Sequence, residues 1–142
     1  MLEVGAVVTT VLSHDPRKAY KAKRRQQTER NLHTAVAEFL DRSLPDASYW
    51  FPVPSASMRN VIQAVNMKRA GELKVGTPDL CIVHRGRAIF IELKSPKGNL
   101  TDSQKEAQKQ ILLAGACTTI ARSVEDVAAF LGMLMPLKGR PQ

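Results

Sequence analysis

The first regular pattern of apolar positions along the chain has the spacing of a helix. Leu32, Val36 and Leu40 lie four residues apart, so their side chains share one face of a helix. Thr28 could accept hydrogen bonds from the first free amide groups of such a helix, and a proline stops it at the other end. We therefore predict a helix from Thr28 to about Leu44.

The later apolar runs alternate between strand and helix patterns. We predict strands at Tyr49–Val53, Leu80–His84, Arg87–Leu93 and Cys117–Arg122, and helices at Ser57–Arg69, Thr101–Ala114 and from a Ser123 cap to just before Pro136. Pro52 makes the first strand a short one or an edge strand. In the second helix, Val61, Ile62 and Val65 are expected to point inward. Interleaved strands and helices imply an α/β fold, with a sheet covered by helices on both faces.

The length of the chain indicates a single domain, and its composition gives a strong positive charge. The 142 residues suffice for one domain, which we place at residues 28–136, after an apolar segment and basic arm at 1–27 and before a tail at 137–142. Lys and Arg number 21 against 13 Asp and Glu, a net charge of +8. Such an excess favours polyanions as partners. The basic run at Pro16–Arg25 is either a solvated arm or a nucleic-acid contact.

The cysteine content and the apolar runs indicate a cytoplasmic protein. Cys81 and Cys117 each lie within an apolar run and are expected to be free thiols. No run approaches the roughly 18 apolar residues of a membrane span, so we expect no membrane partner. The basic residues come after the apolar Met1–Leu12 segment and not before it, which is the wrong order for a secretory signal.

The two central strands bring charged side chains together. A two-residue turn at Arg85-Gly86 would place Asp79 directly opposite Glu92, with Lys94 on the same face. Two adjacent carboxylates repel each other unless a cation neutralises them, and Mg²⁺ prefers oxygen ligands. The alternative is a salt bridge at a sheet edge. Because Glu92 follows a strand that should be buried, it is not an ordinary surface carboxylate.

Three motifs in order resemble those of a known family. They are Gly76-Thr77-Pro78-Asp79-Leu80, Ile91-Glu92-Leu93-Lys94 and Leu100-Thr101-Asp102-Ser103-Gln104. They are similar to the VRR-NUC (virus-type replication-repair nuclease) domain of the PD-(D/E)xK superfamily, and the resemblance covers roughly Thr28 to Phe130. It implies a restriction-endonuclease-like fold and metal-dependent phosphodiester hydrolysis.

The same resemblance implies roles for individual residues. Asp79, Glu92 and the backbone carbonyl of Ile91 would be metal ligands for Mg²⁺, with Mn²⁺ as a substitute. Lys94 would be catalytic and Gln104 would support the site. Whether Lys94 orients a water, accepts its proton or stabilises the transition state is left open.

Two helical residues have structural and functional interpretations. Gln104 follows Thr101 by three residues, which is the spacing of a capping box, yet it also faces inward; the two roles can coexist. Glu29 is in phase with Leu32 and Val36, so it is the candidate third acid, binding the metal directly or through water. Its alternative is favourable placement near a helix N-terminus.

The remaining expectations concern the substrate and the assembly. The residues expected to contact nucleic acid are Arg24, Arg25, Arg59, Lys68, Arg69, Lys74 and Lys97. The resemblance implies DNA cleavage that selects branched, flapped or junction structures and not a sequence. The alternatives are a non-catalytic nucleic-acid-binding protein on the same fold and an RNA-directed nuclease. A homodimer, with Met1–Leu12 in the contact, is a further hypothesis.

Overall fold

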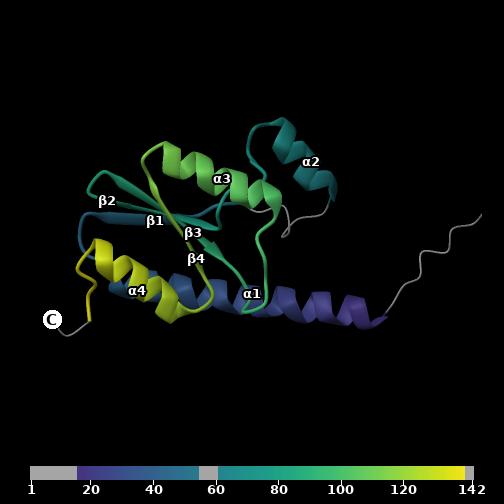
Figure 1. The fold of residues 1–142 in the computed structure, drawn as a ribbon, viewed down its shortest axis with the longest axis horizontal. Helices are drawn as coiled ribbons and strands as arrows, with labels where there is room; N and C mark the ends of the chain where they lie inside the picture. Colours follow the sequence, from purple (N-terminus) through teal and green to yellow (C-terminus); the bar gives the residue numbers. More distant parts are fainter. Residues whose placement is uncertain (1–15, 55–60, 140–142) are drawn as a thin grey trace, which may run out of the picture.

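The centre of the protein is a mixed four-stranded sheet (Figure 1). The computed structural model describes residues 16–54 and 61–139. Its strands are β1 (Ser48–Pro52), β2 (Leu80–His84), β3 (Arg87–Leu93) and β4 (Cys117–Ala121), in the order β1-β2-β3-β4. The first two pairings are antiparallel and β3 pairs with β4 in parallel. The strand containing Pro52 lies at the edge, as predicted, where a missing amide donor is tolerated.

Helices cover both faces of this sheet, which confirms the α/β fold class. Helices α1 (Pro16–Ser43) and α4 (Val124–Leu134) lie on one face, and α3 (Asp102–Leu113) lies on the other (Figure 1). Helix α2 (Val61–Arg69) lies on the α3 side, toward the end of the sheet. The predicted order of helices and strands is confirmed.

The hairpin between β2 and β3 has the predicted two-residue turn. Arg85 and Gly86 have φ angles of 47° and 79°, and positive φ at both positions is the mark of a type I′ turn. His84 consequently pairs with Arg87, and the ladder runs without interruption to the Leu80–Ile91 pair. One residue further along this register, Asp79 lies opposite Glu92.

The two faces of the sheet differ in chemistry. On the α1 and α4 face, fully buried aliphatic side chains form the core, including Val36, Leu40, Ile82, Ile89, Ile91, Val127 and Leu131. On the α3 face, the buried side chains include Glu92 and Lys94, which are 3% and 8% exposed, and α3 itself contributes no buried residue. Stability therefore comes mainly from the α1 and α4 face, whereas the α3 face buries two charged groups beside Cys81.

The predicted start of the first helix is wrong. Helix α1 begins at Pro16, and Thr28 lies within it, where its hydroxyl donates to the carbonyl of Arg24 at 3.0 Å. The lysines, arginines and glutamines before Thr28 are good helix formers, and proline is favoured in the first turn of a helix. The basic run is thus part of a continuous helix.

The inward orientation predicted for three residues of α2 is also wrong. Val61 and Ile62 are 79% and 73% exposed, and Val65 is 43% exposed. Ala64 and Met67, on the other side of the helix, are half-buried instead. The prediction used hydrophobicity alone to decide which side of α2 packs against the molecule. In the structure no residue of α2 is fully buried, whether apolar or polar.

Several expectations concern composition or lie outside the described residues. Cys81 and Cys117 are free thiols, as predicted. Among the described helices, none has the length and hydropathy needed to span a membrane. Arg59, the first residues of the predicted second helix and the Met1–Leu12 segment lie outside the described residues.

Candidate active site

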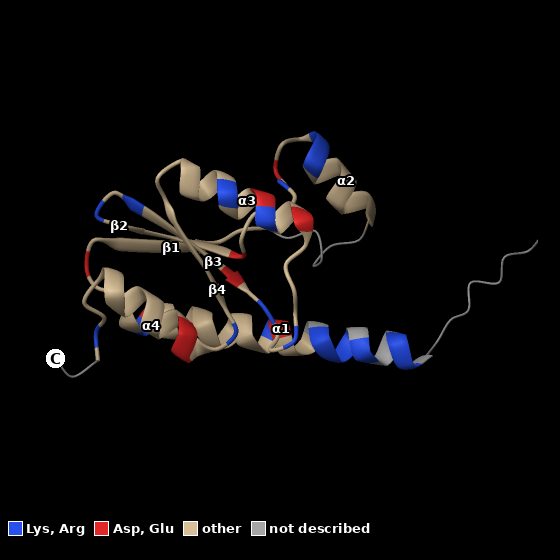
Figure 2. Ribbon diagram, viewed as in Figure 1, with Lys and Arg blue, Asp and Glu red and all other residues tan. Residues whose placement is uncertain are grey.

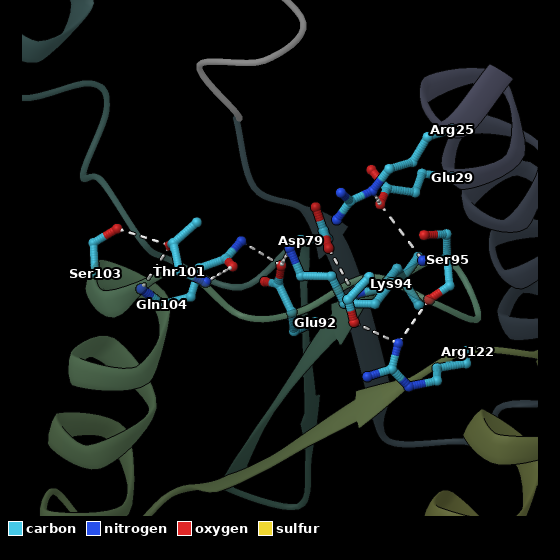
Figure 3. A network of polar contacts seen from close by, with 12 residues as sticks. Arg25, Glu29, Asp79, Glu92, Lys94, Ser95, Thr101, Ser103, Gln104 and Arg122 are labelled. Atoms are coloured by element: carbon cyan, nitrogen blue, oxygen red, sulfur yellow. Dashed lines mark hydrogen bonds and ion pairs between the residues drawn. The ribbon is translucent and has the colours of Figure 1, made fainter. Parts of the chain in front are cut away.

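The structure brings the three charged residues of the central hairpin together. Asp79 immediately precedes β2, Glu92 lies on β3, and Lys94 follows β3 (Figure 3). The Lys94 ammonium lies 3.4 Å from a Glu92 carboxylate oxygen. The Leu93 amide donates to Oδ2 of Asp79 at 2.7 Å. The trio lines a hollow of about 300 Å³, which opens at the end of the sheet between α1 and the start of α3.

Burial and mutual repulsion make it unfavourable for Asp79 and Glu92 to be ionised at the same time. Burial raises the pKa of Glu92 to about 7, helped by the charge of Asp79 and opposed by Lys94. Burial also raises the pKa of Asp79, although the Leu93 hydrogen bond and the nearby His33 and Lys94 oppose the rise. One lysine therefore does not neutralise this pair, and the hollow favours an additional cation.

Gln104 links the start of α3 to the carboxylates. Its side-chain oxygen accepts from the Thr101 amide at 2.9 Å, and the Thr101 hydroxyl accepts from the Gln104 amide, which completes a capping box. Its Nε2 donates to Oε1 of Glu92 at 2.6 Å (Figure 3). The structural and site contacts thus coexist in one side chain, and the cap holds the amide in place against Glu92.

Glu29 reaches the same hollow from helix α1. Its carboxylate accepts from the Ser95 amide at 3.5 Å and lies 3.4 Å from Nε of Arg25 (Figure 3). Glu38 is exposed on the opposite side of the helix, near Arg42. The position of Glu29 on the wall of the hollow agrees with the helical phase that made it the candidate third acid.

Pro78 leaves a backbone oxygen at the site without a ladder donor. Because Leu93 directs its amide to Asp79, its carbonyl points to the same side of β3. Continuing the Leu80–Ile91 register by two residues places Leu93 opposite Pro78, which has no N–H to donate. The Ile91 carbonyl, by contrast, lies within the ladder opposite Leu80. The geometry therefore favours the Leu93 carbonyl over that of Ile91 as a ligand.

Gly76 allows the loop before Asp79 to lie against α3. Its φ is +85°, and a Cβ there would come within 2.2 Å of the Ser103 carbonyl oxygen. Only glycine combines this backbone conformation with so close an approach. The Gly-Thr-Pro-Asp motif thus has three separate physical functions: close packing, a missing donor and a carboxylate.

Comparison with known proteins identifies the family of the chain. The VRR-NUC domain model matches residues 14–125. The chain belongs to the VRR-NUC family. A solved VRR_NUC domain protein is 24% identical, with a TM-score of 0.57 over 75% of this chain and 86% of that one, which shows a shared fold. No curated protein matches the chain. Family membership confirms the resemblance and implies a nuclease-type function with nucleic acid as substrate.

Arg122 is a residue of this VRR-NUC domain that the sequence did not indicate. Its Nη1 donates to the carbonyls of Ser95 and Gly98 at 2.6 and 2.7 Å, and lies 3.5 Å from that of Pro96 (Figure 3). It thereby fixes the loop that follows Lys94. These partners lie 24 to 27 residues earlier in the chain, and no local pattern indicates such a contact.

The predicted nucleic-acid contacts of the VRR-NUC domain lie on several elements. Lys74 lines the hollow and is exposed. Lys68 and Arg69 are exposed at the end of α2, and Lys97 is exposed in the loop after Lys94. Arg24 and Arg25 are exposed on α1. Cations therefore face solvent on both sides of the acidic pair (Figure 2).

Proposed function

We propose that this VRR-NUC domain is a Mg²⁺-dependent nuclease that hydrolyses phosphodiester bonds of DNA, with Mn²⁺ able to replace Mg²⁺. The observation that carries the proposal is the pair Asp79 and Glu92, held on one face beside a buried lysine. A protein that only binds nucleic acid does not need two buried carboxylates, and here burial raises the pKa of both.

The residues at the site fit a hard divalent cation. Asp79, Glu92 and the Leu93 carbonyl offer oxygen donors, and Glu29 is placed to join directly or through water. Within residues 16–54 and 61–139, no three His, Cys, Asp or Glu side chains form a ready-made ligand cluster. Mg²⁺ keeps several waters and takes few protein ligands, so the oxygen donors named above would be enough to hold it. Bound there, the cation would stabilise charge on the phosphate and lower the pKa of water.

The surrounding side chains would orient the reacting groups. Gln104 donates to Oε1 of Glu92 at 2.6 Å, and the Lys94 ammonium lies 3.4 Å from the same oxygen, so the two side chains together would fix the orientation of this carboxylate. Lys94, with a side chain 10% exposed, lies where it can hold a water, take up its proton or stabilise the charge that develops on the phosphate. Arg122 fixes the loop that follows Lys94 by donating to the carbonyls of Ser95 and Gly98.

The surface around the site favours a nucleic-acid backbone as the substrate. The exposed cations of α1, α2 and the Lys97 loop can bind phosphates without reading bases. We therefore infer selection by DNA structure, such as branches, flaps or junctions, and not by sequence. The same surface is compatible with a non-catalytic binding protein, or with RNA as the substrate, and these are the competing functions.

A cleavage panel distinguishes these functions. Purified protein is incubated with linear, flapped, forked and four-way junction DNA and with matched RNA, with Mg²⁺, with Mn²⁺ or with EDTA. We expect cleavage of at least one branched DNA with either metal and none with EDTA. Binding without cleavage in every metal condition would identify the non-catalytic alternative, and preferential cleavage of RNA would identify the other.

Pro78→Ala tests the proposed backbone ligand. The substitution supplies an N–H that can donate to the Leu93 carbonyl and so compete with a cation. We expect about 10-fold more Mg²⁺ to be needed for half-maximal cleavage, with a smaller change in the rate at saturating Mg²⁺. Thermal unfolding without metal controls for lost stability. An unchanged Mg²⁺ requirement in a folded variant would argue against the Leu93 carbonyl as a ligand.

A further inference from the structure

One face of helix α1 changes from apolar to basic where the helix leaves the sheet. Val36 and Leu40 are fully buried on this face, against the sheet, and Glu29, in phase with them, lines the hollow. Continuing toward the N-terminus at spacings of four, four and three residues, the same face carries Arg25, Lys21 and Lys18. At 100° per residue, all three lie within about 80° of Glu29 around the helix axis.

The side chains of this basic half of α1 are largely exposed among the described residues. From Arg17 to Thr28, every side chain whose burial is described is exposed. Figure 2 shows the helix continuing beyond the end of the sheet, with its cations on the part that protrudes. The face that covers the core in one half of the helix is therefore open to solvent in the other.

Arg25 joins this stripe to the candidate active site. Its Nε lies 3.4 Å from Glu29, and its Nη2 would lie 3.0 Å from a Cβ at Gly98, in the loop held by Arg122. The stripe thus begins at the hollow and leads away from it along a straight element. From Lys18 to Glu29 the helix rises about 16 Å.

We propose that Lys18, Lys21 and Arg25 form a rail that binds the backbone of a base-paired arm of the substrate, leading into the hollow. The proposal rests on the proposed nuclease function and specifies its substrate. A rise of about 16 Å corresponds to about 5 base pairs of duplex at 3.4 Å each. The rail therefore requires about that length of duplex on one side of the cleaved phosphate.

The composition of the rail favours duplex over single-stranded DNA. Proteins that hold single strands stack bases on aromatic side chains, and aromatic residues make up only 5% of this chain. A rigid row of cations instead suits the regular phosphates of a duplex, whose high charge density releases more counterions per contact.

Two neighbouring lysines provide a matched test of the rail. Lys21 lies on the stripe, whereas Lys23, two residues along, lies about 200° away around the helix; both are exposed. Lys21→Gln and Lys23→Gln remove the same charge from the same helix. Each is introduced into the full chain carrying Lys94→Ala, and its affinity for a short duplex and for a single strand of the same sequence is measured against salt.

For the duplex, Lys21→Gln is expected to weaken binding about 3-fold or more at low salt and to reduce the slope of log K against log salt by ~0.9. Lys23→Gln should leave the slope unchanged. Equal effects of the two variants would overturn the rail. An equal loss from Lys21→Gln on the single strand would overturn its duplex specificity.

The cleavage rate separates failure of the rail from failure of the nuclease function. The two glutamine variants are also made with Lys94 intact and tested on the DNA that the wild type cuts. If the wild type cleaves the DNA and the two glutamine variants cleave it at equal rates at limiting DNA, the rail is overturned but the nuclease function is not. Absence of wild-type cleavage on every DNA would overturn the proposed function on which the rail rests.

Discussion

Replacing Lys94 with alanine is expected to abolish Mg²⁺- and Mn²⁺-dependent cleavage while leaving DNA affinity nearly intact. Loss of a positioned proton-transfer or charge-stabilising group typically costs about 10²–10⁴ in rate. Lys94 is buried, with a side chain only 10% exposed, so it adds little to the surface that attracts DNA. The measurements are single-turnover cleavage at saturating protein and binding of the same DNA by fluorescence anisotropy.

Lys97→Ala is the matched control for this variant. Lys97 lies three residues further along the same segment but is exposed, so its loss should weaken binding by at most one phosphate contact, ~0.9 in salt slope, and leave the saturated rate unchanged. Cleavage by Lys94→Ala at the wild-type rate would refute the catalytic assignment. A circular dichroism spectrum and a thermal melt confirm that each variant is folded.

Replacing Glu92 with glutamine is expected to abolish cleavage and yet stabilise the metal-free protein above neutral pH. In the folded protein the pKa of Glu92 is raised from 4.5 to about 7. A carboxyl whose pKa is higher in the folded protein than in the unfolded chain stabilises the fold fully when the pH is below its pKa in the unfolded chain. This stabilisation is lost as the pH rises to about 7. Without metal, the free energy of unfolding of the wild type should therefore decrease by roughly 3 kcal/mol as the pH rises from 4.5 to about 7.

Glu92→Gln removes this loss because glutamine does not ionise, and its amide is nearly isosteric with the protonated acid. The free energy of unfolding in EDTA, measured with urea, should match the wild type at about pH 4.5 and exceed it at about pH 8. A parallel decline of both proteins with pH would show that Glu92 is not the group responsible.

The same pKa predicts the pH dependence of cleavage by the wild type. Ligand oxygens must be deprotonated to bind a cation, so at limiting Mg²⁺ the rate should rise with pH up to about 7 and level off above it. Excess Mg²⁺ should move the rise to lower pH, because the cation competes with the proton. A rate that does not change across this range would separate Glu92 from cation binding.

The hairpin shows how much of the site could be predicted from the sequence. A two-residue turn at Arg85-Gly86 determines the register by counting, so the juxtaposition of Asp79 and Glu92 followed from the turn alone. The same count also places Pro78 opposite Leu93. The missing donor could therefore have been predicted from the sequence, because proline has no N–H.

Features that depend on tertiary contacts were less accessible. The start of α1 was missed because Thr28 has the composition of a cap, although the residues before it favour a helix equally well. The orientation of α2 depends on what lies next to it, and its β-branched residues Val61, Ile62 and Val65 are exposed. Arg122 acts on carbonyl groups distant in sequence, and a backbone oxygen has no residue type to search for.

The continuity of helix α1 limits how the length of its protruding half can change. Each residue inserted or deleted between Arg25 and Glu29 would turn Lys18, Lys21 and Arg25 by 100° relative to the sheet. A single insertion would therefore direct these side chains away from the hollow while moving them only about 1.5 Å along the axis. Changes of 3 or 4 residues would turn them by about 60° or 40°, and changes of about 7 or 11 residues by only about 20°, so the reach of this segment can be altered only in steps of about one helical turn.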